Sequence, residues 1–231
     1  RLAERRRRAF LHEAEHLARI ELRRLCDGCL LAAYHRFAKA YVAHLTLSPL
    51  IDGFALTTDE PLVRSLQTAL NRRGASERYT DLIAPTYEGF SQREERELLA
   101  TRGTRSALAA HQQKYSWIRN NYAQDSNISV AEISHRYHVL EKRDRNADRP
   151  MTPRSKEKLM EKLRLPERLR ELIELTGQSR IWQDQRKEST LIATSRLMPL
   201  LREFARRTGC SLDELRYAAP PEMEALLQKK V

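Results

Sequence analysis

Apolar residues recur every three or four positions along most of this chain, and that spacing places them on one face of an α-helix. The first such stripe begins at Leu11, and the helical pattern continues to about Leu45. Seven glycines in 231 residues leave few positions for tight hairpin turns. We find no convincing strand pattern. The sequence therefore predicts an all-α, multi-helix bundle with one long N-terminal helix.

A long helix is also predicted near the C-terminus, where apolar spacing runs through Leu197, Leu201 and Phe204. Pro199 lies inside this segment and should kink or split it, because proline lacks the backbone N–H that a helix interior needs. Shorter helices are indicated by Ser followed by Glu three residues later, the capping-box pattern. This pattern occurs at Ser91, Ser129 and Ser211.

The chain divides by composition into three parts. Residues 1–143 form an N-terminal helical part, 156–231 form a C-terminal helical part, and the polar, proline-containing stretch 144–155 between them is predicted to be an exposed loop. We expect the two helical parts to belong to one continuous helical domain. The segment HQQKYSWI, at residues 111–118, should close a helix that ends near residues 120–121.

The net charge of +11 and the pI of about 9.9 favour anionic partners. Basic and acidic residues are interleaved, with eight Arg against four Glu in residues 1–24, which is typical of solvated helix faces. The sequence has no signature of a known nucleic-acid-binding motif, so nucleic acid is the less favoured anionic partner.

No apolar window approaches the ~20 residues that cross a bilayer, and no signal peptide is visible. Three cysteines give no disulfide framework and favour a reducing, cytoplasmic compartment. The chain does not begin with Met, and we expect it to be a piece of a longer polypeptide.

Two short motifs could bind metal or carry redox chemistry. His12, Glu13 and His16 match the spacing of a zinc-binding helix, but Glu15 and the surrounding arginines are unsuited to a dication. Cys26 and Cys29 have CxxC spacing without the second ligand pair that a zinc site needs. Since Cys29 falls on the apolar stripe, it is predicted to be a small core residue, and no metal site is expected.

HQQKYSWI resembles an H-x-x-K-Y-x-W element of the phosphoenolpyruvate-utilising enzymes, which include phosphoenolpyruvate synthase-like and rifampicin phosphotransferase-like proteins. The upstream LIAPTYEGFSQREERELLATR and the downstream RKESTLIATSRLMPLLREFARRTGCSLDELRYAAPPEMEALL resemble flanking segments of that family in the same order. The resemblance covers roughly residues 82–122 and 185–227. It departs from the family pattern at YAAPPEM, which has Ala219 and a second proline.

The resemblance implies a helical connector or acceptor-side domain of a phosphotransferase. Its partners would be an ATP-grasp domain and a swivelling phosphohistidine domain, and its acceptor an anionic substrate. ATP and Mg²⁺ would be bound by the parent enzyme and not by this chain, which lacks the Gly-rich His loop and has too few glycines for an ATP-grasp domain. We therefore expect no catalytic residue and no cofactor in this chain.

An aromatic corner near residue 115 is the part most suited to face a ligand or partner, because aromatics with a polar group suit a half-buried wall. The alternative is an aromatic corner whose polar groups are all hydrogen-bonded within the protein and which binds no ligand. The candidates are His111, Lys114, Tyr115, Trp117, Arg119, Asn121, Tyr122, Arg186 and Lys187. The second candidate function is a non-catalytic basic module that binds nucleic acid or an acidic protein.

Overall fold

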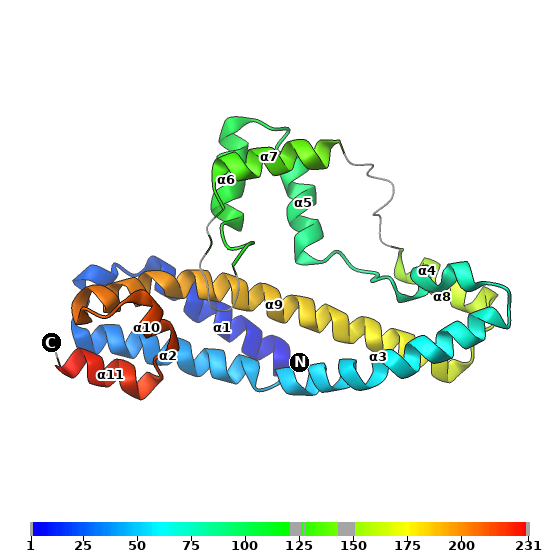
Figure 1. The fold of residues 1–231 in the computed structure, drawn as a ribbon, viewed down its shortest axis with the longest axis horizontal. Coiled ribbons are helices and arrows are strands. Elements are labelled where there is room, and N and C mark those ends of the chain that lie inside the picture. The colour runs from blue at the N-terminus through cyan, green and yellow to red at the C-terminus, as the bar shows by residue number, and fades with distance from the viewer. Residues whose placement is uncertain (1, 121–125, 127, 143–150, 230–231) are drawn as a thin grey trace. The chain divides into compact units, whose positions relative to one another are not determined.

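The computed structural model describes residues 2–120, 126, 128–142 and 151–229, with side chains omitted at 48–51 and 54–59. Within these ranges every regular element is a helix, so the all-α prediction is confirmed (Figure 1). The chain forms two compact units. Unit 1 comprises Arg1–Leu47, Gln112–Ser129 and Lys187–Val231, and unit 2 comprises Ser48–His111 and Val130–Arg186. The sequence-based boundaries at 143 and 156 stay a prediction.

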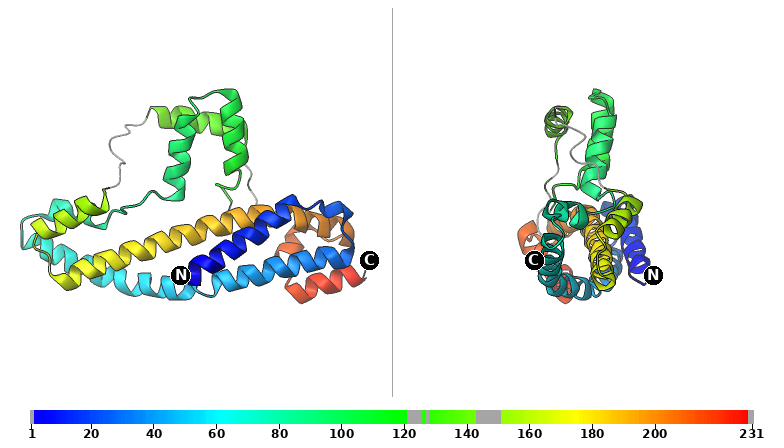
Figure 2. Two further views of the ribbon diagram at one scale, coloured as in Figure 1. Left: turned by 180° about the vertical axis from the view of Figure 1, so that it is seen from behind. Right: turned by 90° about the vertical axis from the view of Figure 1, so that its right-hand side faces the viewer.

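Unit 1 begins with a helical hairpin in place of the single long helix expected to continue to Leu45. Helix α1 (Leu2–Arg19) and helix α2 (Asp27–Leu45) are joined by a short 3₁₀ turn and pack against each other (Figure 2, left). Their antiparallel register is fixed by the rings of Phe10 and Phe37, whose centroids are 5.4 Å apart. Folding back buries the apolar stripe of each helix against the other, which one extended helix cannot do.

The C-terminal helices complete the core of unit 1. They are the C-terminal part of α9 (Glu167–Thr208), then α10 (Leu212–Tyr217) and α11 (Pro220–Lys229). Helix α9 continues through Pro199, so this proline does not split it. Helix α10 starts with the predicted capping box, in which the Ser211 hydroxyl accepts the N–H of Glu214 at 3.2 Å. The largest fully buried side chains of this core are Phe10, Leu30, Met198, Leu200 and Phe204.

Unit 2 packs α3 (Ser48–Asn71), α4 (Tyr79–Ile83) and α8 (Pro153–Lys162) around the N-terminal part of α9. The Arg73 guanidinium joins two of these helices. It donates to the carbonyl oxygens of Leu163 and Arg164 at 2.6 and 2.9 Å, just beyond the end of α8. Helix α8 begins within the expected loop 144–155, with Thr152 as its N-cap.

Two cations face the end of α4 in unit 2. Lys156 is buried and its Nζ donates to the carbonyl oxygen of Ala84 at 2.8 Å, while Arg180 donates to that of Ile83 at 2.7 Å. Both carbonyls belong to the last turn of a helix, which has no further helical donors. The two side chains therefore act as a C-terminal cap supplied from other helices.

Three more helices of the chain are α5 (Phe90–Ala100), α6 (Arg105–Tyr115) and α7 (Val130–Glu141). The prediction that Ser91 caps α5 is wrong, since the N-cap is Gly89, two residues earlier, and Ser91 lies inside the first turn. The first backbone donors are bound by Gln92 and by Asp184, which accepts the N–H of Phe90 at 3.1 Å. None of the helices in the described ranges combines the length and hydrophobicity that a bilayer span requires.

Candidate functional site

His111, the first residue of the aromatic segment, belongs to a buried charged cluster in unit 2. Its Nε2 lies 2.9 Å from Oε1 of Glu94, and Arg136 donates to both carboxylate oxygens of Glu94 at 2.8 Å. The side chain of Glu94 is 0% exposed. The three residues come from α6, α5 and α7, so the cluster ties these helices together.

Burial alone would raise the pKa of the Glu94 carboxyl, but the hydrogen bonds from His111 and Arg136 and the Arg136 charge outweigh it and lower the pKa. Glu94 is therefore an ionised, fully paired carboxylate. Because no atom of its side chain reaches solvent, it cannot contact a substrate in this arrangement. The cluster is a structural clamp.

The other aromatic candidates lie in unit 1. Tyr115 and Trp117 are buried with ring centroids 5.7 Å apart, and Nε1 of Trp117 donates to the carbonyl oxygen of Lys114 at 2.9 Å. The Lys114 ammonium lies 5.2 Å from the centroid of the Tyr115 ring, a cation–π distance. Helix α6 ends at Tyr115, several residues before the predicted end. The two rings and the Lys114 residue therefore contact one another within this short segment.

The remaining candidates are dispersed. Arg119 and Lys187 are exposed, and Arg186 binds Oδ2 of Asp52 at 2.6 Å within unit 2. Asn121 and Tyr122 lie outside the described residues. The structure thus pairs His111 and Arg186 with acids in unit 2 and places Tyr115 and Trp117 in unit 1. A role for these residues in facing a partner stays a prediction.

The side chains of the HEAEH motif, all of them in the described part of the chain, are not arranged to bind a metal ion. His12 is exposed, and Arg36 approaches both of the other residues, with its Nη2 3.5 Å from Nε2 of His16 and its Nε 3.7 Å from Oε2 of Glu13. The positive charge of a guanidinium at this distance repels a divalent metal ion. Among the described residues, no group of three or more His, Cys, Asp or Glu side chains is arranged to bind a metal ion.

The prediction that Cys29 is a core residue is wrong. Both Cys26 and Cys29 are exposed, because the stripe on which Cys29 was placed is interrupted before α2. Cys26 is the N-cap of α2 and its sulfur lies 2.8 Å from that of Cys29. Cys210, by contrast, packs partly against the core of unit 1.

A groove of about 720 Å³ lies between α3 and α9 in unit 2. We name it the arginine groove. Its apolar surface comes from Pro61, Ala69, Leu169 and Leu172, and hydroxyl groups come from Ser65 and Thr68. Its basic residues are Arg64, Arg72, Arg73 and Arg168.

The four arginines differ in whether their side chains already bind another group of the protein. Arg73 binds backbone carbonyls, and Arg64 pairs with Glu60 one turn earlier. The side chains of Arg72 and Arg168 are exposed and have no hydrogen bond or ion pair within the described part of the chain. These two guanidinium groups, one from each wall, are available to an external anion.

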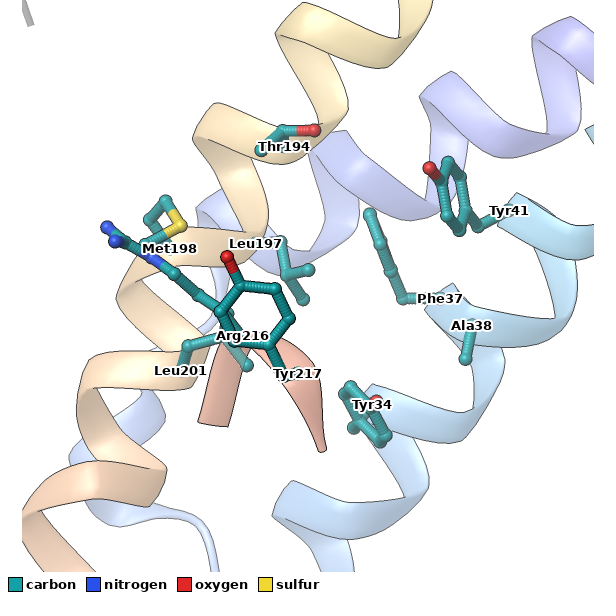
Figure 3. A pocket seen from close by; sticks show the side chains of 10 residues that line it. All are labelled: Tyr34, Phe37, Ala38, Tyr41, Thr194, Leu197, Met198, Leu201, Arg216 and Tyr217. Atoms are coloured by element: carbon teal, nitrogen blue, oxygen red, sulfur yellow. The ribbon is translucent and has the colours of Figure 1, made fainter. Parts of the chain in front are cut away.

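A second, smaller pocket of about 280 Å³ lies in unit 1 between α2, α9 and α10 (Figure 3). Tyr34, Phe37 and Tyr41 face Leu197 across it, and the ring of Tyr217 stands at its mouth, 82% exposed. Burial raises the pKa of Tyr34. The volume falls just below the roughly 300–1,000 Å³ of small-molecule sites, and we assign no ligand to it.

Sequence reasoning missed the arginine groove, although half of it was visible in the sequence. Arg64, Thr68 and Arg72 are spaced by four residues and therefore share one face of α3. The opposite wall could not be found in the same way, because Arg168 reaches the groove through tertiary packing. Comparison with models of known protein families, with curated proteins and with solved structures gives no match.

Proposed function

We propose that this protein is a non-catalytic helical binding module that holds an acidic, amphipathic segment of a partner protein in the arginine groove. The observation that carries this proposal is the pair of arginines, Arg72 and Arg168, on opposite walls of a groove with an apolar lining, whose side chains have no partner among the described residues. Guanidinium groups bind carboxylates through paired hydrogen bonds. Apolar side chains of the same segment would fill the floor, as in other helix-in-groove complexes.

The apolar floor favours a protein segment over nucleic acid. A nucleic acid presents phosphates at regular spacing and is bound by basic stripes, often with aromatic stacking platforms. Leu169 and Leu172 in the groove supply neither, but they match the apolar face of an amphipathic helix. The net charge of +11 adds long-range attraction for an acidic partner.

Fluorescence anisotropy with a labelled synthetic peptide tests the proposal. The probe carries Glu on one face of a helix and Leu on the other. Control peptides replace all Leu by Ser or all Glu by Gln, and a single-stranded oligonucleotide is tested in parallel. We expect the amphipathic acidic peptide to bind more tightly than either control peptide. Tighter binding of the oligonucleotide would instead favour nucleic acid.

A charge-matched pair of variants locates the binding surface. Arg72→Glu with Arg168→Glu should weaken peptide binding about tenfold or more, equivalent to ~1.4 kcal/mol. Arg105→Glu with Arg154→Glu changes the net charge equally at exposed positions that do not line the groove. Equal losses in the two double variants would mean that only the overall charge matters, and the groove proposal would fail.

The resemblance to phosphoenolpyruvate-utilising enzymes supports a second candidate, a connector domain of a phosphotransferase. Its support is the order of the three sequence segments around residues 82–122 and 185–227. Titration of this chain with an isolated swivelling phosphohistidine domain from such an enzyme tests it. Saturable binding that depends on the phosphorylation of the histidine is expected, and no detectable binding would contradict it.

A further inference from the structure

The two exposed cysteines at the start of α2 form a site that the groove does not use. The Cys26 and Cys29 sulfurs are 2.8 Å apart, and Cys26 Sγ also accepts the backbone N–H of Cys29 at 3.2 Å. A disulfide bond is about 2.05 Å long, so the two sulfurs need to approach by less than an ångström. The reduced pair is already arranged for closure.

The surrounding chain holds this geometry in place. Helix α2 is 19 residues long and starts at Asp27, between the two cysteines. Arg207 of α9 binds Oδ1 of Asp27 at 2.8 Å and the carbonyl oxygen of Leu22 at 3.1 Å. Both sides of Cys26 are therefore anchored to the core of unit 1, while the sulfurs remain open to solvent.

We propose that Cys26 and Cys29 form a reversible dithiol–disulfide couple, in which Cys26 attacks and Cys29 resolves. The substrate class is a disulfide, R–S–S–R. The Cys26 thiolate attacks one sulfur, forms a mixed disulfide and releases one R–S⁻. The Cys29 thiol then loses its proton to solvent, and its sulfur attacks that of Cys26 and expels the second R–S⁻. Two electrons pass from the protein dithiol to the substrate disulfide.

The assignment of roles follows from the positions of the sulfurs. The N-cap sulfur of Cys26 accepts a backbone N–H, and the side-chain hydrogen bond between the two cysteines is the main reason that the pKa of Cys26 is lowered. The same contact raises the pKa of Cys29. A thiolate is the attacking form in thiol–disulfide exchange, so Cys26 reacts first.

Reaction with oxidised glutathione, followed by acid quenching, alkylation of free thiols and intact mass measurement, tests the proposal. The wild type and Cys210→Ser should lose two hydrogens and keep no glutathione adduct. Cys29→Ser should accumulate a stable glutathione adduct on Cys26, and Cys26→Ser should react at least tenfold more slowly. Far-UV circular dichroism shows whether each variant is folded.

Two results would overturn the proposal. One is a lasting glutathione adduct on Cys210→Ser, in which only Cys26 and Cys29 can react, because it would mean that Cys29 does not resolve the adduct on Cys26. The other is equal reaction rates for Cys26→Ser and Cys29→Ser. A second measurement does not depend on a variant. In the wild-type protein, the alkylation rate of Cys26 with iodoacetamide should have its pH midpoint below about 8.5, the ordinary pKa of a cysteine, because the pKa of Cys26 is lowered. A midpoint at or above about 8.5 would remove Cys26 as the attacking sulfur.

Discussion

Gly103 lies directly against the ring of Tyr137, with no room for a side chain between them. A Cβ atom at Gly103 would be 2.8 Å from Cε1 of Tyr137, closer than carbon atoms approach in folded proteins. The backbone there also has a φ of 68°, which favours glycine. The turn between α5 and α6 thus requires glycine for two separate reasons.

Comparison of two alanine variants separates these reasons. Gly103→Ala should lower the free energy of unfolding by about 2–4 kcal/mol, the sum of backbone strain and the clash. Gly74→Ala, at φ 61° with open space around the added atom, should cost about 1–2 kcal/mol from strain alone. Urea unfolding followed by far-UV circular dichroism measures both. Equal losses would show that the Tyr137 ring moves aside freely.

Replacement of the buried carboxylate should be more costly than replacement of an exposed one. Glu94→Gln leaves Arg136 and His111 without their anion, and we expect a loss of about 3 kcal/mol in unfolding free energy. Glu88→Gln removes the more exposed ion pair with Arg96 and should cost at most about 1 kcal/mol. Urea titrations of the two variants decide this. A small loss for Glu94→Gln would mean that the clamp is not needed for stability.

Acid should destabilise unit 1 through Glu203. Hydrogen bonds from Arg206 and Arg207 outweigh burial and lower the pKa of Glu203 from 4.5 to about 2. The folded state thus holds the carboxylate more strongly than the unfolded state, so this stability is present above pH 4.5 and lost as pH falls toward 2. Glu203→Gln should flatten the pH dependence of unfolding in that window. Glu15→Gln, at an exposed position of α1, should leave it unchanged.

Lys156 should also make stability rise with pH, but in the alkaline range. Burial, with a smaller contribution from the Arg180 charge, lowers its pKa from 10.5 to about 8. Between these values the unfolded chain binds more protons than the folded chain, so the contribution of Lys156 to stability rises with pH. We expect Lys156→Met to remove this rise, measured by urea unfolding at several pH values. The exposed Lys158→Met is the control, and a rise that persists in Lys156→Met would contradict the assignment.

Two capping boxes show how much of the fold the sequence could predict. Ser211 and Glu214 cap α10 as expected, because that bond needs only two residues three positions apart. Ser91 and Glu94 have the same spacing, yet Glu94 binds His111 and Arg136, which are 17 and 42 positions away. The capping-box pattern predicted the N-cap correctly at α10, where Glu214 binds Ser211 and not a distant residue.

The same limit explains the candidate sites. Helical spacing predicted the all-α class and a C-terminal helix through Leu201 and Phe204, because periodicity depends on neighbouring residues. It could not show that the chain reverses before α2, and so it placed Cys29 in the core. The wall of the arginine groove on α3 was visible as a four-residue repeat, whereas the position of Arg168 opposite it depends on packing.

The bonds of Arg73 also lead us to expect an order of events in folding. Helix α8 has ten residues, too few for a helix that is stable alone in water. The carbonyls after its last turn are bound by a side chain 90 positions earlier in the chain. Closure of such a long loop is slow compared with local helix formation. We therefore expect α8 to gain protection from hydrogen exchange only after α3 has formed.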